Sequence, residues 1–274
     1  MPHPAQELKR LGIRPRKSWG QNFLVDMSPI WGSEHLFLKD KVILEIGPGL
    51  GMITQYFSQL GFSMILVEKD KILAHDLQQR FPQHEVICAD FLDLDSDFFK
   101  KKGVCQIISN LPFYITTPIL EKVVLFLPEV ERALFGMQKE VAQRIVKEKG
   151  SSLALFMKAF GESQIFRHIS RRAFYPEPEV DVSFLFWRRQ EKIAQKREFE
   201  LLLRALFWGR RKKIATSLLR SPHLAQAKLS FHIRRRLEEL KKKEIANLME
   251  RRSDSLSFSE VQTLFCFLFD DPAS

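Results

Sequence analysis

The chain has 274 residues, of which 45% are hydrophobic and 28% charged, and its net charge is +10. This length exceeds the usual single-core size of about 100–200 residues, so one large domain and one smaller domain are expected. No apolar run approaches the roughly 18 residues that span a bilayer, and the N-terminus lacks the apolar core of a signal peptide. These features predict a cytoplasmic, soluble protein without a membrane partner.

Cysteine and histidine show no metal-binding pattern. The three cysteines, Cys88, Cys105 and Cys266, share no C-x-x-C spacing, and the seven histidines lack ligand spacing. We therefore expect neither a zinc site nor a disulfide framework, and no bound metal.

The first predicted elements are short runs rich in Val, Ile and Leu that alternate with helical patterns. Strands are expected at 41–47, 63–70, 85–90, 105–110 and 132–138, and helices between them at 51–60, 71–81 and 117–127. Strands that are apolar on both faces are typical of a parallel sheet covered by helices on both sides. The pattern predicts an α/β fold with a doubly wound, Rossmann-like sheet.

Two later runs, 163–169 and 181–189, follow a helix pair and leave little room for a crossover, so an antiparallel hairpin is expected at one sheet edge. After about Arg189 the strand signal vanishes. Apolar residues then recur at helical spacing in four segments, 198–208, 212–220, 230–250 and 257–269. We expect a catalytic domain of residues 1–189 and a small all-helical domain of residues 190–274.

The positive charge is concentrated in the last third of the chain. Residues 1–185 carry 23 Lys+Arg against 22 Asp+Glu, whereas residues 186–274 carry 20 against 11. The basic runs there are Arg210-Arg211-Lys212-Lys213, Arg234-Arg235-Arg236, Lys241-Lys242-Lys243 and Arg251-Arg252. A single run is typical of a solvated helix face, but several runs in one small domain predict binding to a nucleic acid.

The first strand leads into "EIGPGLG", which places Gly47, Gly49 and Gly51 just before a helix. Glycines there let backbone approach a ligand at a helix N-terminus, although a plain strand-to-helix turn explains them equally well. Glu68 ends the second strand, 17 residues after Gly51, where an acid accepts hydrogen bonds from ribose hydroxyls. This combination favours a nucleoside cofactor.

Glu45, two residues before Gly47, decides between cofactors. A carboxylate suits a pyrophosphate poorly but suits a ligand with ammonium and sulfonium charge, so S-adenosyl-L-methionine is the expected cofactor. Asp90 ends the third strand, where it could bind the exocyclic amine of the adenine. A role as a helix cap explains an aspartate at this position equally well.

The fourth strand ends on Asn110-Leu111-Pro112-Phe113, at the carboxyl edge where ligands bind in this fold. An aromatic amine such as adenine N6 is a poor nucleophile because its lone pair is delocalised into the ring, so it needs hydrogen-bond acceptors. The Asn110 oxygen and a backbone carbonyl near Pro112 supply two, and Phe113 offers a stacking face. Catalysis would then rest on alignment and electrostatics without an obligatory general base.

Eight motifs together resemble the ribosomal RNA adenine dimethyltransferases of the KsgA/RsmA type. In chain order they are "GQNFL", "EIGPGLG", "VEKD", "AD" at Ala89-Asp90, "NLPFYITTP", "QKEVAQR", "AFYPEPEVD" and "FWGRRKKIATSL". The resemblance implies transfer of methyl groups from S-adenosyl-L-methionine to N6 of two adjacent adenosines near the 3′ end of small-subunit (16S) ribosomal RNA. It implies ribosomal RNA and the immature small ribosomal subunit as partners, and nothing in the sequence demands more than a monomer.

The resemblance also assigns site residues. The residues implied to contact the cofactor are Asn22, Leu24, Gly47, Glu68, Asp90 and Asn110. The catalytic set would be Asn110, Pro112 and Phe113, with Phe174 as a second aromatic that sandwiches the flipped adenine. Without the other motifs, Phe174 would be interpreted as a buried aromatic at a sheet edge.

Two departures from the family pattern bear on activity. Phe113 replaces the usual tyrosine, so stacking is kept and a hydroxyl is lost, and the Tyr114 side chain is expected to point elsewhere. Glu177 and Glu179 add acidic charge that weakens nearby RNA contact. Two alternatives stay open, a methyltransferase of large-subunit ribosomal RNA and a non-catalytic ribosome assembly factor.

Overall fold

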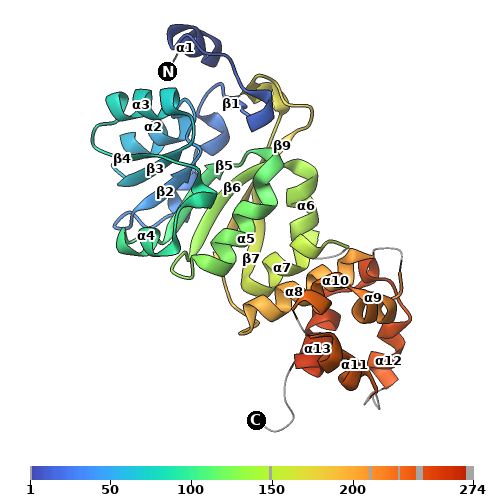
Figure 1. Cartoon of the computed structure of the whole chain (residues 1–274). Coiled ribbons are helices and arrows are strands. Elements are labelled where there is room, and N and C mark those ends of the chain that lie inside the picture. The colour runs from blue at the N-terminus through green and yellow to red at the C-terminus, as the bar shows by residue number, and fades with distance from the viewer. Residues whose placement is uncertain (1, 148–149, 210–211, 228, 239–242, 270–274) are drawn as a thin grey trace. The chain divides into compact units, whose positions relative to one another are not determined.

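The computed structural model describes residues 2–147, 150–209, 212–227, 229–238 and 243–269 (Figure 1). The chain forms two compact units. The first contains Met1–Gln143 and Ser163–Arg189, and the second contains Arg144–Glu162 and Gln190–Ser274. This division differs from the predicted one at residue 189 in a single segment, residues 144–162, which groups with the C-terminal helices.

The first unit is built on a sheet of seven strands in the order β4-β3-β2-β5-β6-β9-β7. The strands are β2 Ile43–Ile46, β3 Met64–Glu68, β4 Glu85–Cys88, β5 Gln106–Asn110, β6 Arg132–Gln138, β7 Gly161–Ile169 and β9 Val182–Arg189. Neighbours from β4 to β6 are parallel, and β9 runs antiparallel to β6. Because the order reverses between β2 and β5, the predicted doubly wound α/β fold is confirmed.

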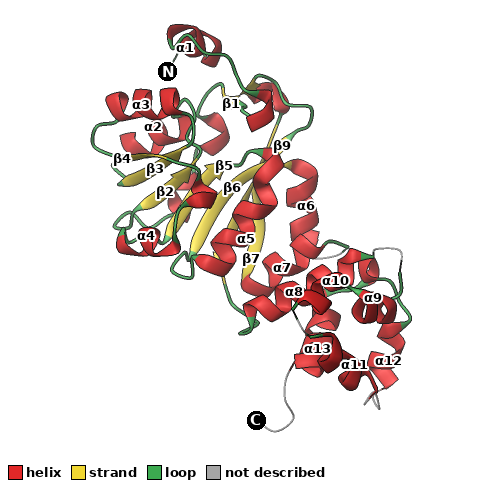
Figure 2. Ribbon diagram, in the orientation of Figure 1, coloured by secondary structure: helices red, strands yellow, loops and turns green. Residues whose placement is uncertain are grey.

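Helices cover the sheet because its strands are apolar on both sides. Successive residues of β2, Ile43 and Leu44, face opposite sides of the sheet and both are fully buried. Helix α5 crosses the sheet in the view of Figure 2. The helices whose residues lie wholly or partly in this unit are α1 Pro4–Arg10, α2 Met52–Gln59, α3 Lys71–Arg80, α4 Ser96–Lys101, α5 Thr116–Phe126 and α6 Lys139–Lys147.

A second, two-stranded sheet joins distant parts of the sequence. Strand β1, Phe23–Leu24, pairs antiparallel with β8, Phe174–Tyr175, and Leu24 lies opposite Phe174. The backbone N–H of Val25 extends the pairing by donating to the carbonyl of Ala173 at 2.9 Å. Two-residue strands carry no periodic signal, so the sequence did not predict this sheet. It fixes the segment that contains "GQNFL" to the segment that contains "AFYPEP".

The second unit is helical, as predicted for the C-terminal region. Its helices are α7 Ser152–Phe160, α8 Lys196–Trp208, α9 Ile214–Arg220, α10 Pro222–Gln226, α11 Ser230–Glu238, α12 Lys243–Met249 and α13 Phe258–Phe269. Their core contains the buried rings of Phe199 and Phe265, whose centroids lie 5.3 Å apart in an edge-to-face contact. No helix in the described part of the chain is long and apolar enough to cross a membrane.

Some residues of the basic runs stabilise this unit. Arg236 donates to the Phe267 carbonyl at the end of α13, and Arg251 forms an ion pair with Glu260 at 2.5 Å. Arginine at a helix C-terminus also complements the helix dipole. Arg210, Arg211, Lys241 and Lys242, which the charge pattern assigned to RNA binding, lie outside the described residues.

Candidate active site

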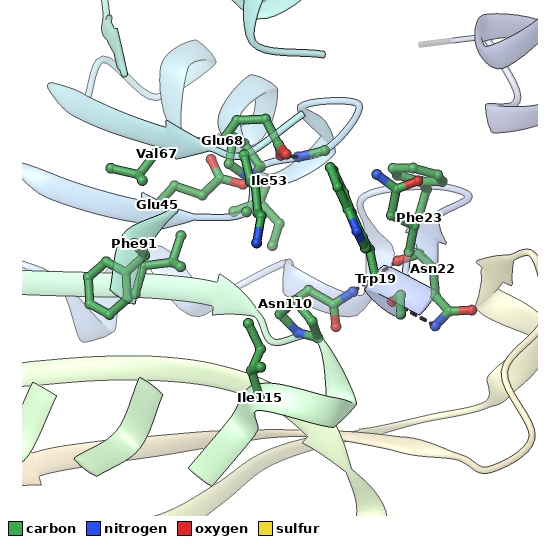
Figure 3. A pocket seen from close by; sticks show the side chains of 18 of the residues that line it. Trp19, Asn22, Phe23, Glu45, Ile53, Val67, Glu68, Phe91, Asn110 and Ile115 are labelled. Carbon is green, nitrogen blue, oxygen red and sulfur yellow. Dashed lines mark hydrogen bonds between the residues drawn. The ribbon is translucent and has the colours of Figure 1, made fainter. Parts of the chain in front are cut away.

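A pocket lies at the carboxyl ends of β2, β3, β4 and β5, where the strand order reverses (Figure 3). Its walls come from residues 19–24, the glycine-rich segment 45–53, the ends of β3 and β4, and the segment after β5. Glu45 and Glu68 enter from one side in this view, and Asn110 and Ile115 from the other. Ligands bind at this switch point in doubly wound sheets, so the position alone makes the pocket the candidate site.

The glycine-rich turn is shaped by close packing behind it. Gly49 has a φ of +58°, and a Cβ there would lie 2.9 Å from the Phe23 ring. Gly47 has a φ of +65° and nothing within 4 Å of such a Cβ, so its Cα borders open space. Positive φ and close approach are the two reasons for glycine at such positions. The turn therefore forms the backbone cradle that the sequence predicted.

The Glu68 carboxylate holds this cradle from β3. Its Oε2 accepts the N–H of Gly49 at 2.9 Å, and its Oε1 accepts the N–H of Asp70 at 2.9 Å. Burial raises the pKa of Glu68, while these two hydrogen bonds oppose the rise. Each carboxylate oxygen has a second lone pair, so Glu68 can still accept a hydroxyl from a ligand.

Glu45 is a second buried carboxyl beneath the cradle. Thr54 donates its hydroxyl to Oε2 of Glu45 at 2.6 Å. Burial raises the pKa of Glu45 to about 8, the Thr54 hydrogen bond opposes that rise, and the nearby Glu68 adds to it. A positively charged ligand group in this pocket would stabilise the ionised form.

Asp90 lies at the rim with a cationic partner. Its Oδ2 is 2.7 Å from Nζ of Lys69, and its Oδ1 accepts the N–H of Leu92 at 2.9 Å. Burial opposes ionisation of Asp90, but these contacts outweigh it and lower its pKa. Trp19 stands beside this pair, with Nζ of Lys69 5.5 Å from its ring centroid and the Arg16 guanidinium 4.2 Å away. Asp90 therefore caps the turn that follows it and also lines the pocket.

Asn110 is the last residue of β5 and lines the pocket. Its Nδ2 donates to the carbonyl of Asn22 at 3.1 Å, which assigns the orientation of the amide. The other atom, Oδ1, is buried and has no hydrogen-bond partner among the described residues. Buried polar atoms are nearly always paired, so an unpaired acceptor at this edge indicates a place for a ligand donor.

Gly136 makes room for that acceptor. Gly136 is a residue of β6 and lies opposite Asn110 of β5 and Phe184 of β9. A Cβ on Gly136 would lie 2.8 Å from Oδ1 of Asn110, closer than real Cβ atoms come, and 3.0 Å from the Phe184 ring, which is tighter than most Cβ contacts. Its φ is not positive, so glycine is required here for space and not for backbone freedom.

The residues after Asn110 differ in where they face. The carbonyl of Pro112 already accepts the N–H of Ile115 at 3.1 Å and the hydroxyl of Thr116 at 3.2 Å. In the described part of the chain, no hydrogen bond reaches the carbonyl of Leu111. The carbonyl of Leu111 is therefore the candidate for the second acceptor near Pro112, although Leu111 is 1% exposed and is not among the residues that line the pocket.

The predicted aromatic residues do not line this pocket. Phe113 packs, partly buried, against a core cluster that includes Phe174, and Phe174 is 3% exposed. Tyr114 does line the pocket and is 53% exposed, with its ring 3.5 Å from the position of a Cβ on Gly20. Tyr114 and Phe113 therefore face different sides, as expected, because the 3₁₀ turn Phe113–Ile115 directs consecutive side chains to different sides.

Seven of the predicted site residues line the pocket together: Asn22, Leu24, Gly47, Glu68, Asp90, Asn110 and Pro112. Sequence reasoning missed Trp19, Lys69 and Tyr114, which also line it. Each of these three stands next to or within a motif that was quoted, so proximity to "GQNFL", "VEKD" and "NLPF" was the available signal.

A chain of charged groups supports the cradle from α3. Asp76, which is 4% exposed, accepts Arg10 of α1 at 2.5 Å and Arg80 at 2.7 Å. Arg80 in turn donates to the carbonyl of Leu50 at 2.7 Å, within the pocket wall. Bidentate use of one buried carboxylate fixes both arginines. The N-terminal helix is thereby tied to the cofactor cradle.

The residues present fit S-adenosyl-L-methionine. Glu68 suits ribose hydroxyls, Asp90 suits an exocyclic amine, and the carboxyl of Glu45 suits cationic groups. Gly47 leaves space at the cradle, and the unpaired Oδ1 of Asn110 provides an acceptor beside it.

Comparison with known proteins decides the family. The family model of ribosomal RNA adenine dimethylase matches residues 12–254. The chain belongs to the ribosomal RNA adenine dimethylase family. The cofactor of these dimethylases, S-adenosyl-L-methionine, is therefore the cofactor of this chain, and the predicted family is confirmed.

Individual relatives of the dimethylase family agree. The chain is 37% identical over 183 residues to the ribosomal RNA small subunit methyltransferase A of Chlorobium luteolum, covering 64% of this chain and 66% of that protein. It is 31% identical over 253 residues to the same-named protein of Chlorobium phaeobacteroides strain DSM 266, covering 89% and 94%.

Two solved structures share the dimethylase fold. A dimethyladenosine transferase from Plasmodium falciparum has a TM-score of 0.66 at 22% identity, covering 86% of this chain and 91% of that one. The 23S rRNA methyltransferase ErmE has a TM-score of 0.63 at 23% identity, covering 90% and 99%.

Proposed function

We propose that this protein dimethylates N6 of two adjacent adenosines near the 3′ end of small-subunit (16S) ribosomal RNA. It acts in the cytoplasm, as a monomer, on the immature small subunit during small-subunit biogenesis. The observation that carries the proposal is the buried, unpaired Oδ1 of Asn110 beside a cradle suited to S-adenosyl-L-methionine. The names of the curated relatives support the small subunit as the substrate.

In this proposal the chain aligns the target amine. Oδ1 of Asn110 and the carbonyl of Leu111 accept the two N6 hydrogens, which directs the nitrogen lone pair away from the ring. Two fixed acceptors stabilise charge that develops on the nitrogen. No general base is required, because the methylated nitrogen is acidic and loses its proton to water.

When bound, S-adenosyl-L-methionine supplies an electrophilic methyl group on a sulfonium. Asn22, Leu24 and Gly47 would hold its methionine end, Glu68 its ribose and Asp90 its adenine. Glu45 would lie beneath as the nearest buried carboxyl. These residues bind and orient, and the unpaired amide oxygen of Asn110 faces the acceptor base.

Phe113 and Phe174 remain the proposed stacking pair for the flipped adenine. Phe113 is partly buried and packs against the core cluster that contains Phe174 of β8, which is 3% exposed, so Phe174 can stack on a base only if its ring is uncovered. The basic helical unit would bind RNA backbone, so affinity should fall as salt rises.

The experiment is methyl transfer from labelled S-adenosyl-L-methionine to unmethylated small subunits, with large subunits and naked RNA assayed in parallel. Modified bases are identified by mass spectrometry, and Asn110→Ala is the matched inactive control. Dimethyladenosine at two adjacent positions of small-subunit RNA, absent with Asn110→Ala, supports the proposal. Modification of large subunits alone supports the first alternative function. Subunit binding without transfer supports the assembly-factor alternative.

A further inference from the structure

Lys122, in the middle of α5, donates all of its ammonium hydrogen bonds to backbone carbonyls of one turn, residues 91–94. Its Nζ lies 2.8 Å from the carbonyl oxygen of Phe91, 2.9 Å from that of Leu92 and 2.5 Å from that of Leu94. A lysine ammonium has three N–H donors, so all three are used. Lysine is rarely buried unless its charge is satisfied, and Lys122 is partly buried.

The turn that Lys122 holds is a wall of the cofactor pocket. Ala89, Asp90 and Phe91 line the pocket, and Asp90 caps the 3₁₀ turn Phe91–Asp93 by accepting the N–H of Leu92. Phe91 is 4% exposed, and Nζ of Lys122 lies 5.1 Å from its ring centroid. The turn is held from the other side by β3, where the N–H of Ala89 donates to the carbonyl of Glu68 at 3.1 Å.

Helix α5 also carries the other end of the site. It begins directly after the Asn110 motif, and Thr116 in its first turn donates to the carbonyl of Pro112. Ile119 lines the pocket, and Lys122 follows it three residues later on the same side of the helix. One helix therefore joins the segment that would hold the target amine to the turn that carries Asp90.

We infer that Lys122 is a positioning residue for the adenine end of the cofactor. It orders the turn so that the Asp90 carboxylate meets the exocyclic amine and Phe91 closes the pocket beside the ring. The inference rests on the proposed function, in which Asp90 recognises that amine. Without the three donors, the carbonyls lose their partner, the turn relaxes, and both affinity and selectivity for adenine fall.

The test compares Lys122→Met, which keeps the length of the side chain without its donors, with Lys122→Arg, which keeps charge and donors. Lys101→Met is the matched control, because Lys101 is an exposed lysine of α4 whose loss changes the net charge equally. Binding of S-adenosylhomocysteine and of S-inosylhomocysteine, which has oxygen in place of the amine, is measured by calorimetry on the full chain.

Lys122→Met should weaken binding of S-adenosylhomocysteine by about 5- to 20-fold and reduce the preference over S-inosylhomocysteine several-fold. Lys122→Arg should retain part of the affinity and part of the preference. Lys101→Met should leave the affinity and the preference unchanged. At saturating cofactor, kcat should stay within about twofold, because Asn110 is unchanged.

An unchanged preference in Lys122→Met would overturn the inference, whether affinity is kept or both ligands weaken equally, since equal weakening indicates only a structural role. The assay needs no RNA. A chain that binds the cofactor analogue but transfers no methyl group contradicts the proposed function and leaves this test intact. A wild-type chain that binds neither analogue contradicts both.

Discussion

The two sides of the pocket are organised differently. On the cofactor side, the protein satisfies its own polar groups: both oxygens of Glu68 accept backbone N–H groups, and Asp90 is held by Lys69 and Leu92. On the target side, Oδ1 of Asn110 is buried without a partner. In the proposed function, the cofactor side is assembled by folding, whereas the target side is completed only by a substrate.

The largest effect is expected on the target side. Asn110→Ala removes the unpaired acceptor and should reduce kcat by about 100- to 1,000-fold, as for loss of one preorganised polar group in other enzymes. Affinity for S-adenosylhomocysteine should change far less, because the cradle and Glu68 are untouched. Steady-state kinetics measures the change in kcat, and calorimetry measures the change in affinity for S-adenosylhomocysteine. An equal loss of affinity and turnover would mean that the two sides are not distinct.

The next effect tests the space behind that acceptor. Gly136→Ala places a Cβ against Oδ1 of Asn110 and the Phe184 ring, and should lower kcat about 10- to 100-fold through misplacement of the amide. Stability should fall by roughly 1–3 kcal/mol from overpacking. The double variant Gly136→Ala, Phe184→Leu relieves only the ring contact. It should therefore regain stability without regaining kcat, and recovery of both would contradict the role of Asn110.

On the cofactor side, the buried carboxyl of Glu45 should make the stability of the protein depend on pH. Burial raises the pKa of Glu45 to about 8 in the folded protein, whereas the unfolded chain ionises near the ordinary value of about 4.3. Between these values the unfolded state binds fewer protons, so this carboxyl makes stability fall as pH rises. Below the lower value, and above the higher one, its contribution is flat.

Glu45→Gln removes that titration while keeping an oxygen for Thr54. Relative to wild type, the variant should gain about 1–4 kcal/mol in free energy of unfolding between pH 5 and pH 8. Urea denaturation of both proteins at the two pH values measures the difference in free energy of unfolding between variant and wild type. The other titrating groups are the same in both proteins, so their contributions cancel in this difference. A constant difference between variant and wild type would show that Glu45 is ionised throughout.

The smallest effect is expected at the rim. The side chains of Lys69 and Asp90 are 48% and 21% exposed, and such partly solvated ion pairs contribute little. Lys69→Met should change affinity for S-adenosylhomocysteine by about threefold at most, and less at high salt. Calorimetry at two salt concentrations measures it. A tenfold loss that persists in salt would place Lys69 among the groups that contact the cofactor directly.

Sequence patterns predicted the parts of the site that lie at strand ends. Glu68 and Asn110 each close an apolar run, and parallel strands bring their carboxyl ends to one edge. The doubly wound sheet followed from the same periodicity, and the cradle from the spacing of its glycines. The eight motifs in order then identified the family, which no single motif could have done.

Contacts between segments far apart in sequence were not predictable in this way. Lys122 belongs to an ordinary helical pattern, and nothing in that pattern marks three carbonyls of the Asp90 turn as its partners. Asp76 likewise gives no sign that it bridges Arg10 and Arg80. The direction of Tyr114 depends on a 3₁₀ turn that the aromatic run does not reveal. These features arise from tertiary packing, which local propensity does not encode.

The pairing of β1 with β8 has a consequence for how the protein is made. Strand β1 carries Phe23 and Leu24, which line the pocket, but its partner is Phe174–Tyr175, near the far end of the first unit. Chains emerge from the ribosome N-terminus first, and closing so long a loop costs entropy until its contacts form. The glycine cradle and Asn110 are thus synthesised well before this wall can close, so a nascent chain acquires a complete binding site only late in its translation.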